Sequence, residues 1–359
     1  MTAPDPREDA FRAFKLPADH PGFIRGGRVM GGKVGVLVLN LGTPDGTGYW
    51  PMRRYLSEFL SDKRVIDWPA ALWQPVLQGI ILSVRPGKKG KDYASIWNNE
   101  RNEGPLLTIT RNQAEKLATE LAPYSDRILV DFAMRYGNPA TGPAIERLLK
   151  RGCDRILLLP MYPQYSVATT ATAADEAFRQ LMVMEWQPAV RVAPPWHDDP
   201  VYIDALASSV HEHLATLDFE PDILLASFHG VPQRYLLKGD PYHCQCVKTA
   251  RLLRETLQWP KERFRQTFQS RFGPEQWLKP YTDETVEELA KSGVKTMAML
   301  APGFSADCLE TLEELDVENR EIFLHNGGEK FAYIPCLNDS DLGIKVMKNV
   351  ALRELGGWI

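Results

Sequence analysis

Residues 223–232 read I-L-L-A-S-F-H-G-V-P, an apolar run that ends abruptly at His229. Gly230 and Pro232 prevent the extended run from continuing, so the segment is typical of a short buried strand. Such a strand places an imidazole at the carboxyl end of a sheet, where open α/β folds bind their ligands. A turn histidine without a role is the alternative. A second segment, residues 297–314, favours a functional site because it also places carboxylates after a buried strand.

The composition describes an ordinary globular protein. The chain has 359 residues, of which 44% are hydrophobic and 25% are charged, enough for two α/β units and a large core. Its net charge of −4 gives no case for a nucleic-acid partner. No apolar run reaches the roughly 18 residues that span a bilayer. The polar start, residues 1–10, lacks the core of a signal peptide and predicts a cytoplasmic location, or one on the cytosolic face of a membrane.

The five cysteines are odd in number and scattered, which does not indicate a disulfide framework. Cys244 and Cys246, beside His243, form a small cluster that could be half of a metal site. A reduced loop is the alternative, because no second pair lies nearby in the sequence.

An internal repeat organises the chain. Residues 34–41 read as a buried strand that ends in Gly-Thr-Pro, as the strand before His229 ends in Gly-Val-Pro. The motif R-Y-G-N-P at Arg135 resembles R-F-G-P at Arg271. Each motif precedes an amphipathic helical stretch and then a buried strand, at 144–150 and 155–159 in the first copy and at 284–291 and 295–300 in the second. The repeat predicts two α/β lobes with a ligand in the cleft between them.

The repeat also gives the domain boundaries. We expect an N-terminal arm at 1–33, an N-terminal lobe at 34–205, a C-terminal lobe at 206–340 and a final helix at 341–359 that packs back on the core. The first lobe holds about 50 extra residues, roughly residues 46–105, after its first strand, which is the position of a lid over the cleft.

The lid has an unusual composition. Residues 68–84 are apolar, with two Trp, and are followed by the basic residues Arg85, Lys88, Lys89 and Lys91. If the apolar segment 68–84 (the lip) is exposed beside these basic residues (the basic collar), it would suit a hydrophobic ligand or a membrane interface. A lid helix packed on its own domain is the alternative.

Carboxylates follow the second strand of the C-terminal repeat. Glu310, Glu314 and Glu318 recur at i, i+4 and i+8, so on an α-helix they would share one face. Like charges at this spacing repel, and a solvated face is the ordinary explanation. Together with His229, however, these carboxylates suit Fe²⁺, Mn²⁺ or Zn²⁺ and can accept protons near neutral pH.

At this point the motifs resemble those of the ferrochelatase family, whose members insert Fe²⁺ into a porphyrin. The matching segments occur in the family's order and are 40–44 (N-L-G-T-P), 134–139 (M-R-Y-G-N-P), 162–166 (Y-P-Q-Y-S), 227–230 (S-F-H-G), 239–242 (G-D-P-Y), 269–274 (Q-S-R-F-G-P), 277–280 (W-L-K-P), 282–284 (T-D-E) and 304–307 (F-S-A-D). The resemblance implies an α/β fold of two Rossmann-like lobes, each with a parallel sheet flanked by helices. It further implies a lyase that makes protohaem from protoporphyrin IX and Fe²⁺, the last step of haem biosynthesis.

The resemblance also assigns site residues. It implies catalytic roles for His229 and Glu310, and a metal role for both of them together with Glu314 and Glu318, which lead toward the surface. The expected substrate contacts are Leu41, Arg85, Tyr93, Tyr162, Trp277 and Phe304. For Trp277, packing inside the second lobe is the alternative.

Three departures from the family pattern affect these expectations. Cys308 stands where many relatives have a second histidine, so that residue's role is altered or absent. Leu41 stands where relatives acting on coproporphyrin carry a tyrosine, which favours protoporphyrin IX. The chain ends at Ile359 without the Cys-rich tail of animal relatives, and Val167 replaces a cluster cysteine, so we expect no iron–sulfur cluster and no cofactor beyond the Fe²⁺ substrate.

Two alternatives stay open. One is a chelatase for another metal or tetrapyrrole, and the other is a two-lobed protein that binds a tetrapyrrole without chemistry. The expected partners are protoporphyrin IX and Fe²⁺, with peripheral membrane contact as an option. The sequence does not indicate an oligomeric state.

Overall fold

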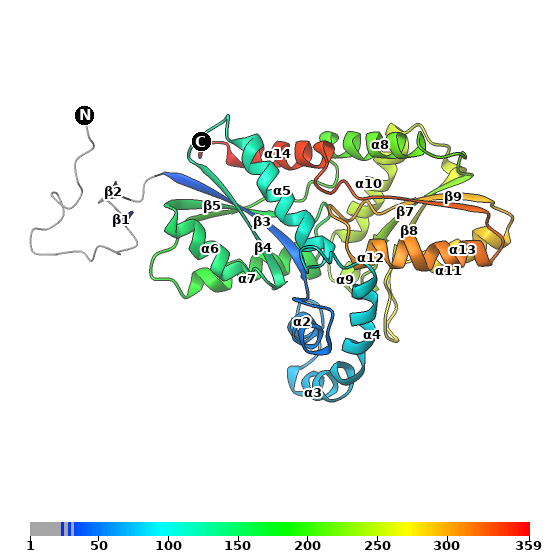
Figure 1. Cartoon of the computed structure of the whole chain (residues 1–359), viewed down its shortest axis with the longest axis horizontal. Coiled ribbons are helices and arrows are strands. Elements are labelled where there is room, and N and C mark those ends of the chain that lie inside the picture. Colours follow the sequence, from blue (N-terminus) through cyan, green and yellow to red (C-terminus); the bar gives the residue numbers. More distant parts are fainter. Residues whose placement is uncertain (1–22, 25–27, 30–31) are drawn as a thin grey trace, which may run out of the picture.

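The computed structural model describes residues 23–24, 28–29 and 32–359. Most of the predicted arm at 1–33 lies outside the described residues, apart from the short antiparallel strands β1 (Phe23–Ile24) and β2 (Arg28–Val29). The rest of the described chain is built on two parallel sheets, each flanked by helices (Figure 1). The predicted α/β fold class is therefore confirmed.

The two sheets have the same topology. The first has the order β4-β3-β5-β6 and the second β8-β7-β9-β10, with all neighbours parallel. The strands of the first sheet are β3 (Lys33–Thr43), β4 (Ile128–Gly137), β5 (Cys153–Pro160) and β6 (Ala189–Val192). Those of the second are β7 (Ile223–His229), β8 (Phe264–Gln269), β9 (Thr296–Leu300) and β10 (Lys330–Ile334). The internal repeat is thus a repeat of sheet topology.

The central strands are apolar on both faces because helices cover both sides of each sheet. In β3, Val34, Val36 and Val38 face one core, whereas Leu37 and Leu39 face another. This division follows from the period-2 geometry of a strand. The continuous apolar runs in the sequence therefore belong to strands buried on both faces.

One of the apolar cores is shared by both lobes. It joins the Val34 face of β3 to Leu224, Ala226 and Phe228 of β7 through the last helix, α14 (Asp341–Leu355). That helix packs against α5 (Pro105–Leu121) and α8 (Pro200–Leu214) along the upper side of Figure 1. The predicted boundary between residues 205 and 206 falls inside α8, which packs on α14 and on α10 (Tyr242–Thr256).

The other helices cover the remaining faces of the sheets. Around the first sheet they are α6 (Thr141–Lys150), the π-helix η2 (Val167–Ala171) and α7 (Thr172–Met182). Around the second they are α9 (Gln233–Leu237), the 3₁₀-helix η3 (Lys261–Arg263), α11 (Thr282–Lys291), α12 (Leu309–Leu312), the π-helix η4 (Glu314–Asn319) and α13 (Arg320–His325). Among the described residues, no helix combines the length and apolarity that crossing a membrane requires.

Strand register corrects one detail of the predicted repeat. Asn40 of β3 pairs with Met134 of β4, and Phe228 of β7 pairs with Phe268 of β8. Met134 and Phe268 each form a further bridge to the loop that follows their strand. Arg135 therefore corresponds to Gln269, and the predicted match of Arg135 with Arg271 is wrong.

The error arose because the R-F-G-P motif lies in a longer loop beyond β8 instead of on the strand. In the corrected register, Leu41 and His229 are equivalent, since each directly follows its paired residue, Asn40 or Phe228. The two lobes therefore present an apolar side chain and an imidazole at matching positions.

The predicted lid consists of α2 (Tyr49–Ser61), α3 (Ala70–Val76), the π-helix η1 (Leu77–Ile81) and α4 (Leu82–Ser95), which extend below the sheets in Figure 1. Its inner face packs on its own lobe through an apolar cluster that includes Met52, Leu77 and Leu82. Its outer face carries an exposed apolar row, namely Leu72, Val76, Ile80 and Val84. The packed lid therefore describes the inner face and the exposed apolar lip describes the outer face, whereas contact of that lip with a ligand or a membrane stays a prediction.

A buried ion pair joins the lid to the first sheet. Asp62, directly after α2, pairs with Arg135 of β4, and their side chains are 9% and 7% exposed. Tyr136 donates a hydrogen bond of 2.8 Å to the same carboxylate, and Thr172 of α7 also contacts it. The base of the lid is thus held to the first sheet by charge and hydrogen bonding.

Candidate active site

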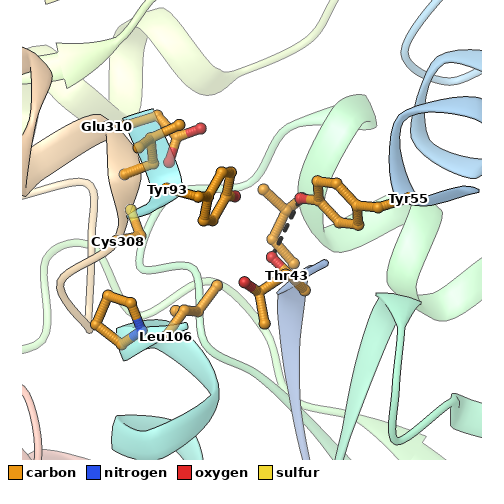
Figure 2. A pocket seen from close by; sticks show the side chains of 10 residues that line it. Thr43, Tyr55, Tyr93, Leu106, Cys308 and Glu310 are labelled. Atoms are coloured by element: carbon orange, nitrogen blue, oxygen red, sulfur yellow. Dashed lines mark hydrogen bonds between the residues drawn. The ribbon is translucent and has the colours of Figure 1, made fainter. Parts of the chain in front are cut away.

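A pocket forms where the lid and both lobes meet. Figure 2 shows Cys308 and Glu310 on one side and Tyr55 on the other, with the ring of Tyr93 between them. The complete lining is Leu41, Gly42 and Thr43 at the end of β3, Tyr55 of α2, Tyr93 of α4, Pro105 and Leu106 of α5, and Cys308, Leu309 and Glu310 of the C-terminal lobe. The predicted residues Leu41, Tyr93 and Glu310 are therefore brought together.

Gly42 allows the two strands at this pocket to approach closely. Its φ is +116°, and a Cβ atom built on it would lie 1.8 Å from the carbonyl oxygen of Tyr136. A side chain cannot be accommodated there without moving β4. The glycine after Leu41 is thus required by backbone packing.

His229 ends β7 and is half-buried. Its Nδ1 lies 2.5 Å from the carbonyl oxygen of Gly230, which can only accept a hydrogen bond. In the neutral imidazole this contact places the proton on Nδ1 and leaves the lone pair on Nε2. The ring centroid of Phe304 lies 6.5 Å from that of His229, so these two predicted residues are neighbours.

The acidic residues are tied to the strand beside His229. Gln269, the last residue of β8, donates a hydrogen bond of 2.7 Å to the carbonyl oxygen of Glu310. The backbone N–H of Ser270 donates to Glu314 Oε1 at 2.7 Å, and the Ser270 hydroxyl donates to Oε2. The start of α12 is closed by Cys308, whose thiol and Thr311 cap each other's backbone N–H groups. These contacts fix the backbone of Glu310 and the side chain of Glu314.

The acids do not lie on one regular α-helix as predicted. After α12 the chain forms the π-helix η4, in which the N–H of Glu318 donates to the carbonyl of Glu313, five residues earlier, at 2.9 Å. The prediction assumed i→i+4 spacing throughout, and π-turns often occur at functional sites. Glu310 and Glu314 are half-buried and Glu318 is exposed, so the row leads from the pocket to the surface.

Charges in the row act on one another. Burial raises the pKa of Glu314 above its ordinary value and the Glu310 carboxylate adds to this, whereas hydrogen bonds from Ser270 and the charge of His229 oppose it. The catalytic candidates thus lie within electrostatic reach of one another. Burial also raises the pKa of Glu313 to about 7, with contributions from Glu318 and Asp92 and opposition from Lys89.

The raised pKa of Glu313 predicts a pH-dependent stability. A carboxyl whose pKa rises from 4.5 to about 7 on folding binds its proton more tightly in the folded state, so stability is lost as pH rises through that interval. Glu313→Gln removes this loss. Thermal unfolding should give a melting temperature equal to the parent's at pH 5 and higher by about 1–2 °C at pH 8. An equal difference at both pH values would contradict the assignment.

In the part of the chain that the structure describes, no group of three or more His, Cys, Asp or Glu is placed to hold a metal ion. The metal role of His229, Glu310, Glu314 and Glu318 therefore stays a prediction.

The remaining predicted contacts lie outside this pocket. Tyr162 is buried in the first lobe. Trp277 is buried beside Gly230 and its ring centroid lies 4.9 Å from that of Phe272, which agrees with the packing alternative. The guanidinium of Arg85 lies 5.4 Å from the ring centroid of Phe272, so it bridges the lid and the C-terminal lobe.

Seven of the ten lining residues were not among the predicted site residues, namely Gly42, Thr43, Tyr55, Pro105, Leu106, Cys308 and Leu309. Tyr55, Pro105 and Leu106 lie in no motif, because they reach the pocket through the fold of the lid and the start of α5. The strand-end rule could have suggested Thr43, which lies two residues beyond Leu41.

Comparison with known proteins decides the family. The ferrochelatase family model matches residues 33–355. This chain belongs to the ferrochelatase family. It is 61% identical over 344 residues to the ferrochelatase of Allorhizobium ampelinum, covering 96% of this chain and 98% of the relative. The ferrochelatase of Brucella anthropi is 59% identical, over 91% of this chain and 93% of the relative. The predictions of a ferrochelatase, and hence of an enzyme, are confirmed, and neither alternative is favoured.

A solved structure supports the fold of the family. SirB from Bacillus subtilis with Fe³⁺ superposes with a TM-score of 0.53 at 12% identity, covering 90% of this chain and 96% of SirB. Likeness at this identity concerns the fold alone. The prediction of a two-lobed chelatase-like architecture is thus confirmed.

Proposed function

We propose that this ferrochelatase inserts Fe²⁺ into protoporphyrin IX to form protohaem, with release of two pyrrole protons. The observation that carries the proposal is the convergence of both lobes and the lid on one cleft. Glu310 lines the pocket, and its carbonyl oxygen accepts a hydrogen bond from Gln269, the last residue of β8. His229, the last residue of β7, pairs with Gln269 across the sheet. Family membership fixes the class of reaction, and this arrangement supports the roles proposed below.

His229 is the proposed base. Its Nδ1 proton is engaged by the Gly230 carbonyl, so Nε2 is the ring atom free to accept a pyrrole proton. The half-buried position keeps the ring partly away from water, and the neighbouring Phe304 ring limits its rotation. A neutral imidazole can accept a proton near neutral pH without further activation.

The carboxylates are the proposed path for ions. Glu310 lies on the pocket wall, Glu314 is held by Ser270 one turn further on, and Glu318 is exposed. Oxygen ligands of this kind suit Fe²⁺, and the same groups can relay protons outward. Glu310 therefore serves as the inner metal ligand or the next proton acceptor after His229.

The porphyrin contacts divide by polarity. Leu41 offers an apolar surface opposite the imidazole lobe, which supports protoporphyrin IX as the macrocycle, and Tyr93 lies on the same pocket wall as Glu310. Arg85 offers a cation at the edge of the lid for a carboxylate of the substrate. We retain Tyr162, Trp277 and Phe304 as proposed contacts on the strength of the family motif.

The proposal includes no iron–sulfur cluster and no cofactor beyond the Fe²⁺ substrate. The exposed row of Leu72, Val76, Ile80 and Val84 supports a peripheral attachment to the cytosolic face of a membrane. Flotation with vesicles of zwitterionic and anionic lipid checks the attachment, and a protein that stays with the soluble fraction in both cases contradicts it.

The function is tested by absorbance spectroscopy with the purified protein. Protoporphyrin IX with Fe²⁺ under anaerobic conditions, or with Zn²⁺, is expected to give the metalloporphyrin spectrum. Coproporphyrin is expected to be a poorer substrate, because Leu41 gives no polar partner at its position. A protein that binds protoporphyrin but leaves it metal-free would instead be a carrier.

A further inference from the structure

A lysine of the lid stands against the acidic row. Nζ of Lys89 in α4 lies 3.0 Å from Asp92 Oδ2, one turn later on the same helix. The two side chains are 38% and 18% exposed, so the pair is partly withdrawn from water. No residue of this pair was among the expected site residues, although Lys89 belongs to the predicted basic collar.

One turn of α4 separates Lys89 from the pocket wall that contains Glu310. Tyr93, one turn after Lys89, lines the pocket together with Glu310, and it shares an apolar cluster with Leu309. Moving back one turn along α4 reaches Lys89, and moving one turn along the acidic segment reaches Glu313. The charges of Glu310 and Glu313 both act on Lys89, as expected from this arrangement.

The charges on this face are unbalanced. Carboxylates come from the lid and from the acidic segment, namely Asp92, Glu310, Glu313, Glu314 and Glu318. Lys89 is the cation that acts on Glu313, while His229 acts on Glu314 from the other end of the row. A row of this composition attracts divalent cations strongly, and a fixed ammonium beside it weakens that attraction.

We propose that Lys89 sets the metal affinity of the acidic row, as a tethered cation that competes with incoming Fe²⁺ near Glu313. The proposal rests on the function proposed above. Ions move through charged passages when each site binds well enough for entry and weakly enough for exit. Lys89 keeps metal binding weak enough for exit, because its ammonium offsets part of the carboxylate charge. Asp92 acts as the positioning residue that holds the ammonium over the row.

The test is the Lys89→Met variant, which keeps the length of the side chain and removes its charge. With Zn²⁺ as the probe metal, its KM for metal is expected to fall about threefold to tenfold. A change of this size is expected because the variant removes one positive charge that repels the metal across a partly solvated distance. Its KM for protoporphyrin should not change. Binding of Mn²⁺ without porphyrin, followed by electron paramagnetic resonance, should tighten by a similar factor.

Matched variants separate charge from structure. Lys91→Met removes an exposed lysine from the same helix and should leave the metal KM unchanged. Lys89→Arg keeps the charge and should retain the parent value. Asp92→Asn removes a carboxylate and also releases the ammonium of Lys89, so these two effects oppose each other and the metal KM should change less than in Lys89→Met.

Two results would overturn the proposal. One is an unchanged metal KM in folded Lys89→Met, and the other is a raised porphyrin KM with an unchanged metal KM, which would make Lys89 a contact for the substrate's carboxylates. Absence of metallation by the parent protein would instead refute the proposed function, so the two failures are distinguishable.

Discussion

His229→Ala is expected to metallate protoporphyrin about 10²–10⁴-fold more slowly than the parent protein while still binding the macrocycle. The imidazole presents its Nε2 lone pair because the Gly230 carbonyl holds the proton on Nδ1. Alanine leaves no group at the end of β7 that can accept a pyrrole proton. Initial rates with Zn²⁺ and fluorescence titration of porphyrin binding measure the two quantities separately.

His211→Ala is the matched control, because His211 lies exposed on α8, away from the pocket. It should keep the parent rate. Glu310→Gln should also lower the rate, since it removes the charge at the inner end of the row. Parent-like turnover by His229→Ala would remove the imidazole from the mechanism.

Asp62→Ala is expected to lower the free energy of unfolding by about 3–5 kcal/mol, because it removes the close partner of the buried guanidinium of Arg135 and leaves only a longer contact of 3.9 Å to Glu176. Tyr136 and Thr172 lose their shared acceptor in the same step. The carboxyl pKa of Asp62 is lowered despite burial, as hydrogen bonds from Thr172 and Tyr136 and the charge of Arg135 outweigh the desolvation. Urea unfolding followed by far-ultraviolet circular dichroism measures the loss.

An exposed ion pair in the same lid provides the comparison. Asp67 pairs with Lys238 of the C-terminal lobe, and its side chain is 52% exposed. Asp67→Ala should therefore cost only about 0–1 kcal/mol. The double variant Asp62→Leu with Arg135→Met should recover part of the stability, because it removes both buried charges. Equal losses for Asp62→Ala and Asp67→Ala would contradict the buried assignment.

The fold was largely predictable because its elements are long and strongly patterned. The predicted strand before His229 agrees with β7, and the predicted final helix at 341–359 begins where α14 begins, at Asp341, although α14 ends at Leu355. Their periodicity and their Gly or Pro boundaries act locally, so the sequence alone carries them. The mismatch of Arg135 with Arg271 shows the limit, since a similar motif can sit on a strand in one copy and in a loop in the other.

The site was predictable where a residue ends a strand and not where packing brings it in. His229 and Leu41 lie at the carboxyl ends of the central strands β7 and β3, and Glu310 comes after β9 in the chain, so topology places them toward the same edge of the sheets. Tyr55 reaches the pocket because helices of the lid fold over it, which no local pattern encodes. The π-turn at Glu314 was missed for a related reason, because residue spacing alone does not distinguish it from an α-helix.

The core shared by β3, β7 and α14 determines how the cleft can open. The two lobes bury a common apolar core, so their separation would expose this core to water. The cost is about 25 cal/mol for each Å² of apolar surface exposed. We therefore expect the two sheets to keep their relative position when a macrocycle binds, so that any opening comes from the lid beyond its anchored base at Asp62.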